Sequence, residues 1–180
     1  MKLLLSASVA AAIAAFALPA AASPAFDAFR KVCGDSHADF AAIKAALAGP
    51  GWTSADVHPT NMEGVTPDES IARATTAGGQ RVTVDAWIGK KGAYNITACT
   101  AKVVGGAPAD LAREAQAWLG FAPASVDSGK STWRYGVTGG KPAAVDKAGF
   151  NAAAAGTGLF FFNLFPETGD VVLDMLKIKS

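Results

Sequence analysis

Apolar and polar residues alternate along two parts of the chain, and each part contains a turn signal. In the first, every second residue over 82–88 is apolar, "GKKG" at 89–92 supplies a turn, and a second β-rich run follows. Alternation with a period of two is typical of β-strands, so the pattern predicts a hairpin over 81–104. The segment "TWRYGVT" at 132–138 predicts a further strand.

The second part is the C-terminal segment "GLFFFNLFPETGDVVLDMLKIKS", which has the strongest strand pattern in the chain. Residues 166–169 form the predicted turn between two strands. The first of these strands is apolar on both faces, which predicts a central strand that is covered on both sides. The second changes its apolar face near Met175, and we expect a β-bulge there.

Apolar residues spaced by three and four predict helices in the N-terminal region and in the middle of the chain. The N-terminal pattern predicts one helix over 26–33 and a second over 36–47. Ser36 and Asp39 are the predicted capping box of the second helix, with Asp in the place of the usual Glu. The same spacing over 111–119 predicts a mid-chain helix.

The segment "TPDE" at 66–69 also has the pattern of a helix start. Thr66 can act as the N-cap, a proline follows at the first helical position, and Glu69 completes a capping box. We therefore expect a short helix that ends before Gly78. Residues 52–65 have no periodicity and predict a loop, whereas the alanine-rich residues 142–157 fit either a loose helix or a loop.

Helices together with antiparallel hairpins, without alternation of strand and helix, predict an α+β domain. We expect an antiparallel sheet of about five strands, with the N-terminal and mid-chain helices packed on it. No internal repeat is evident in the sequence. About 155 residues follow the apolar N-terminal segment, and this length suits a single domain over 23–180.

The N-terminus has the order of a secretory signal peptide: Lys2, then the uncharged apolar run Leu3–Leu18, a proline and small residues. The pattern predicts a signal peptide over 1–22, with cleavage after Ala22 or as late as Ala25. The alternative is an uncleaved membrane anchor. The run is rich in alanine and no basic cluster follows it, so we expect a periplasmic or secreted protein without stable membrane insertion.

Charge and motifs exclude several classes of partner. The chain has 16 basic and 15 acidic residues, and no run of Lys and Arg exceeds two residues. Such a balance gives no general attraction to nucleic acid, which we exclude as a partner. The segment "YGVTGGKP" at 135–142 lacks the residues of a P-loop, and no nucleophile elbow occurs. We expect no cofactor.

The segment "KVCGDSHAD" at 31–39 allows three interpretations. Cys33 could be a nucleophile with His37 as its base, part of a metal site, or half of a disulfide. Gly34 separates the two predicted helices, so Cys33 and His37 do not share a helical face, and no strong ligand spacing supports a metal site. An exported chain with two cysteines favours a bond between Cys33 and Cys99.

Two classes of function remain open, and whether the protein is an enzyme is undecided. We favour a non-enzymatic binding or envelope-accessory protein of the periplasm, whose partner is a protein or an envelope component. The alternative is a small periplasmic hydrolase that uses His37 or His58. Its acidic partner would be one of three nearby residues, Asp35, Asp39 or Asp56.

Overall fold

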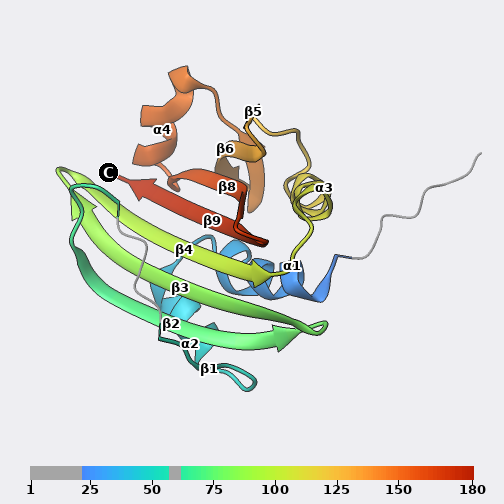
Figure 1. Ribbon diagram of the computed structural model, residues 1–180. Helices are drawn as coiled ribbons and strands as arrows, with labels where there is room; N and C mark the ends of the chain where they lie inside the picture. The colour runs from blue at the N-terminus through green and yellow to red at the C-terminus, as the bar shows by residue number, and fades with distance from the viewer. Residues whose placement is uncertain (1–21, 57–61) are drawn as a thin grey trace, which may run out of the picture.

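The computed structural model describes residues 22–56 and 62–180, whose strands form one sheet (Figure 1). The order of the nine strands is β1-β2-β3-β4-β9-β8-β6-β5, with β7 also paired to β6. The strands are β1 (Thr53–Ser54), β2 (Pro67–Ala77), β3 (Gln80–Lys91), β4 (Tyr94–Val104), β5 (Ser125–Asp127), β6 (Lys130–Thr138), β7 (Lys141–Ala144), β8 (Leu159–Glu167) and β9 (Asp170–Lys179). The helices are α1 (Pro24–Phe29), the π-helix η1 (Arg30–Gly34), α2 (Phe40–Leu47), α3 (Pro108–Leu119), the 3-10 helix η2 (Lys147–Gly149) and α4 (Phe150–Ala155).

The α+β class and the antiparallel sheet are confirmed, because every pair of neighbouring strands runs antiparallel. The expectation of about five strands is wrong. Three of the additional strands, β1, β5 and β7, are too short to show a period in the sequence. The fourth is β2, which occupies the segment where we expected a helix.

Strand β2 replaces the helix predicted from "TPDE". It pairs with β3 from Ala77↔Gln80 to Pro67↔Gly89, with one irregularity near Pro67. The turn that joins the two strands is Gly78–Gly79, and both glycines have positive φ. A capping signal acts only on the first turn of a helix, whereas pairing along the whole of β3 decides the conformation of the segment.

The sheet consists of two halves with the same order of elements. The first half is helical at its start and continues into β2-β3-β4; the second begins with α3 and continues into β6-β8-β9. Helices α1 and α2 contact β3, while α3 contacts β8. The last strands of the two halves, β4 and β9, pair at the centre of the sheet. The halves differ in the connection between their first two long strands. In the first half this connection is Gly78–Gly79, whereas in the second half it is residues 139–158.

One face of the sheet, here called the helix face, packs against α1, η1, α2 and α3. The buried side chains that meet there come from the helices and from alternate positions of the central strands: Phe26, Phe29, Cys33, Ile43, Leu47, Leu111 and Leu119 from the helices, and Val84, Cys99, Trp133, Tyr135, Phe160, Phe162, Leu173 and Met175 from the strands. Helix α2 starts at Phe40 rather than at 36, because Asp39 is its cap: Ala42 N donates to Asp39 Oδ1 at 2.9 Å. Ser36 donates instead to the carbonyl of Val32.

A disulfide joins Cys33 of η1 to Cys99 of β4, as the sequence predicts. Next to it, Gly34 of η1 lies against the Trp118 ring of α3. A Cβ atom on Gly34 would lie 2.7 Å from Cζ2 of Trp118, so the position of this ring requires glycine at residue 34. The ring of Trp118 contacts Phe26 and Phe162, which ties α3 to both α1 and the sheet.

The opposite face, here called the outer face, is also partly covered. Val65, Trp87, Ile96 and Ala98 form a second buried cluster with Leu176 packed against it. Helix α4 adds to this cover, since Phe150 contacts Phe161 edge to face.

Because both faces carry apolar side chains, β9 needs no bulge to bury its residues. The expected bulge near Met175 is wrong, and β9 pairs in one uninterrupted register with both β4 and β8. Strand β8 is central, as predicted, and its two neighbouring phenylalanines point to opposite faces: Phe162 is fully buried and Phe161 half-buried.

Loss of the Cys33–Cys99 bond should clearly reduce stability. The bond spans 66 residues of sequence, and closure of a loop of that size accounts for at most about 4 kcal/mol. We expect Cys33→Ser and Cys99→Ser each to lower the free energy of unfolding by up to this amount, measured by denaturant titration. The double variant should lose about as much as either single variant. Additive losses would show that the cysteines contribute as two separate buried side chains.

Candidate functional site

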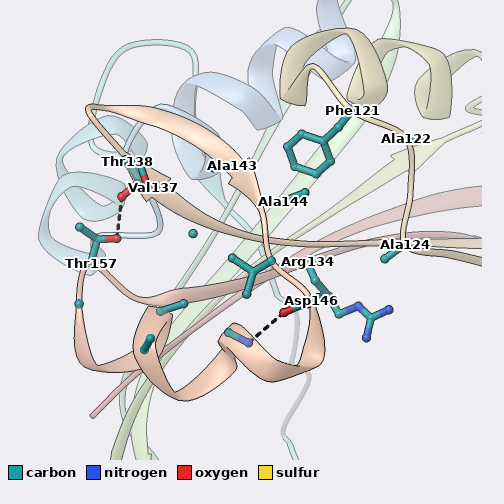
Figure 2. Close-up of a pocket in the computed structure, with 16 residues that line it drawn as sticks. Phe121, Ala122, Ala124, Arg134, Val137, Thr138, Ala143, Ala144, Asp146 and Thr157 are labelled. Atoms are coloured by element: carbon teal, nitrogen blue, oxygen red, sulfur yellow. Dashed lines mark hydrogen bonds between the residues drawn. The ribbon is translucent and has the colours of Figure 1, made fainter.

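A cavity lies beside β6, under the segment that joins β6 to β8 (Figure 2). Its volume is about 870 Å³. Its lining consists of Phe121, Ala122, Ala124, Arg134, Gly136, Val137, Thr138, Ala143, Ala144, Val145, Asp146, Gly149, Ala152, Ala153, Gly156 and Thr157. Cavities of 300–1,000 Å³ with mostly apolar walls are typical of small-molecule sites.

The joining segment is held in place by backbone and side-chain hydrogen bonds. Strand β7 pairs with β6, and beyond it Val145 N donates to the carbonyl of Arg134 at 3.0 Å. Gly149 N donates to Asp146 Oδ1 at 3.0 Å, which caps the short helix η2. After α4, the hydroxyl of Thr157 donates to the carbonyl of Val137 at 3.0 Å. These contacts fix both ends of the segment on β6, so the cavity is a built feature of the fold.

The size of the cavity comes from the small residues that line it. Nine of its lining residues are alanine or glycine, so little side-chain volume enters the space between β7 and α4. At Gly136, a Cβ atom would lie 3.6 Å from Val145 Cγ2 and 3.7 Å from Ala153 Cβ, which is ordinary contact. Val145 and Ala153 therefore bound the cavity on the side of Gly136.

Arg134 and Asp146 are the charged residues of the lining. The guanidinium carbon of Arg134 lies 5.8 Å from the centre of the Phe150 ring. Among the residues that the structure describes, no carboxylate lies within 4.0 Å of this guanidinium, and no hydrogen bond from it occurs. In Figure 2 the Arg134 side chain lies toward Ala124, at the opposite end of the cavity from Thr157.

The residues of "KVCGDSHAD" are not part of this cavity. Cys33 is bonded to Cys99, so it has no thiol to act as a nucleophile. Asp35 pairs with Arg30 at 3.1 Å. The ring of His37 lies edge-on to Phe160, with 6.4 Å between the ring centres, and its φ of 50° is left-handed.

The remaining candidates of the hydrolase alternative are not brought together by the described contacts. Asp39 caps α2 through the hydrogen bond given above, and Asp56 is exposed. His58 lies outside the described residues. Over 22–56 and 62–180, no group of three or more His, Cys, Asp or Glu residues could hold a metal ion. Over the same ranges, no helix is long and apolar enough to span a membrane.

A row of polar side chains crosses the outer face and contains the desolvated carboxyl of Asp174. Thr100 Oγ1 donates to Asp174 Oδ1 at 3.0 Å, and Asn163 Nδ2 donates to Asp174 Oδ2 at 3.1 Å. Thr132 in turn donates to Asn163 Oδ1 at 3.0 Å. Burial raises the pKa of Asp174, and these hydrogen bonds only partly oppose that effect. These hydrogen bonds connect β4, β9, β8 and β6, so the row has a structural role.

Comparisons of the chain with family models, with curated proteins and with solved structures return no match.

Sequence patterns gave no signal for this cavity. Arg134 lies within the strand predicted from "TWRYGVT", and the joining segment within the alanine-rich residues 142–157. Alanine and glycine carry no chemistry that a motif could detect. Only the folded chain places them around one space with a guanidinium at its end.

Asp174 should make stability depend on pH. Its pKa is raised in the folded state, so the folded protein binds this proton more tightly than the unfolded chain does. Stability is therefore highest when the carboxyl is protonated. It falls as the pH rises from the ordinary pKa of an aspartate through the raised value.

We expect Asp174→Asn to remove this part of the pH dependence, measured by denaturant titration over the acidic range. Asp68→Asn, at an exposed position on β2, is the matched control and should retain the slope of the native protein. An unchanged slope in Asp174→Asn would contradict the assignment.

Proposed function

We propose that the protein is an exported, non-enzymatic binding protein that holds an apolar ligand from the cell envelope in the cavity beside β6. The observation that carries the proposal is the cavity itself, with its volume of about 870 Å³ and its walls of alanine, glycine and valine. Burial of an apolar ligand in such a space is favourable because it removes apolar surface from water.

The charged groups of the lining support binding over catalysis. Asp146 is engaged as the cap of η2, and the guanidinium of Arg134 offers hydrogen-bond donors only. Among the lining residues, no nucleophile lies beside a general base. The arrangement supplies walls and one fixed positive charge, which is what retention of a ligand requires.

The proposed location is the periplasm or the exterior of the cell. Its support is the signal-like order of residues 1–22 together with the disulfide, since such bonds persist in oxidising compartments. An envelope component is the natural ligand class for a binding protein in that location.

Export predicts a shortened mature chain. We expect the protein recovered from the periplasm or medium to begin at residue 23 or 26, because small residues precede both positions. Intact-mass measurement checks this. A mass that retains Lys2 would contradict cleavage.

Filling the cavity should abolish binding of an apolar ligand. We expect 1-decanol to bind the native protein and not to bind Ala153→Phe or Ala144→Phe, measured by isothermal titration calorimetry. These residues line the cavity from α4 and from β7, so two different walls are tested. Ala155→Phe is the matched control, because Ala155 lies on α4 but is exposed outside the lining.

Thermal unfolding would establish that each variant is folded. Equal binding by folded Ala153→Phe and Ala144→Phe would contradict the proposed site. So would failure of the native protein to bind decanol.

A further inference from the structure

We infer that the cavity takes a single-chain amphiphile, whose alkyl chain fills the space and whose carboxylate pairs with Arg134. This inference rests on the proposed function and adds the chemical class of the ligand. It depends on the position and the free donors of Arg134, and on the aliphatic character of the walls.

Arg134 is placed to meet an anion. A guanidinium has five N–H donors in a planar arrangement that matches the two oxygens of a carboxylate. Arg30 and Arg113 use such donors on Asp35 and Asp110, respectively. Arg134 has no such partner among the described residues, although it is half-buried and lines the cavity.

The fold holds this guanidinium in position without using its donors. Its backbone carbonyl accepts a hydrogen bond from Val145 N, which fixes the strand at this point. Phe150 provides a ring beneath the guanidinium, and Phe161 contacts that ring edge to face at 5.7 Å. A planar cation on an aromatic face keeps its edge N–H groups available to a ligand.

Asp146 is the one acidic residue of the lining, and its carboxyl already accepts a hydrogen bond from the protein. One of its oxygens accepts the backbone N–H of Gly149, and this donor offsets part of its charge. It lies more than 4.0 Å from the guanidinium, since the two form no ion pair. Among the described residues, the positive charge of Arg134 therefore has no acidic partner. A ligand carboxylate can supply that partner.

The walls favour an alkyl chain over an aromatic body. Phe121 is the aromatic residue of the lining, and most of the other side chains are methyl groups or hydrogen atoms. An aromatic ligand gains most from stacking on rings. A flexible chain gains from any apolar surface and can follow a space bounded by small residues. Arg134 and Thr157 lie at opposite ends of the set of lining residues (Figure 2), which gives room for a chain behind the headgroup.

The test compares decanoate with 1-decanol at neutral pH by isothermal titration calorimetry. The native protein should bind decanoate more tightly than decanol. Arg134→Gln should weaken decanoate binding by roughly tenfold, the scale of a hydrogen-bonded charge, and weaken decanol binding less, so that the preference for decanoate over decanol is lost. Arg134→Lys should retain part of the preference, because it keeps the charge but loses the planar pair of donors.

Arg113→Gln is the matched control. It removes the same charge from the exposed surface of α3, so it changes the net charge without changing the cavity. Decanoate should bind this variant as it binds the native protein.

The outcomes separate the two proposals. If decanol binds and Ala153→Phe blocks it, but Arg134→Gln does not weaken decanoate, the cavity is a binding site and the carboxylate inference is overturned. If Arg113→Gln and Arg134→Gln reduced the affinity for decanoate equally, the inference would also be overturned, because the effect would come from net charge alone. If neither ligand binds the native protein, both proposals fail.

Discussion

Strands β4 and β9 pair antiparallel at the centre of the sheet, from Asn95↔Lys179 to Val104↔Asp170, and this pairing joins the two halves of the fold. The core on the helix face contains residues of both halves. The helices of the first half cover strands of their own half, yet Phe29 of α1 also contacts Phe162 of β8. The disulfide adds a covalent link to the same place, because Cys99 lies opposite Met175 in this pair. The central pair thus positions every element that surrounds it.

The two long hairpins could be predicted because their signals are local. Alternation over 81–104 and the turn at 166–169 both act between residues that are near in sequence. Strand β2 could not be predicted in the same way. Its first residues carry a genuine helix-start signal, and only the presence of β3 beside it makes the extended form more stable. The number of strands was wrong for the same reason, since short strands such as β1 and β7 exist only because a longer neighbour pairs with them.

The disulfide was predictable from two cysteines and a signal-like N-terminus, whereas the cavity was not. Patterns of His, Cys, Asp and Ser indicate chemistry because those side chains react or coordinate. The walls beside β6 consist largely of Ala and Gly, whose contribution is the absence of volume. The sequence around Arg134 does not indicate a binding role either, since an arginine in a strand is usually solvated or paired. Its significance depends on which carboxylates the fold brings near it, and that is a property of the tertiary structure.

The comparison between the two halves explains where the cavity arises. In the first half, Gly78–Gly79 turns the chain directly from β2 into β3. At the corresponding point of the second half, the chain leaves β6 and forms β7, η2 and α4 before it enters β8. The sheet and its core do not require this segment, because the first half forms the same strands without one. A long connection on a rigid scaffold is a common place for function. Here it forms one side of the cavity and places Phe150 beneath Arg134, so the scaffold and the proposed binding site are separate contributions of one chain.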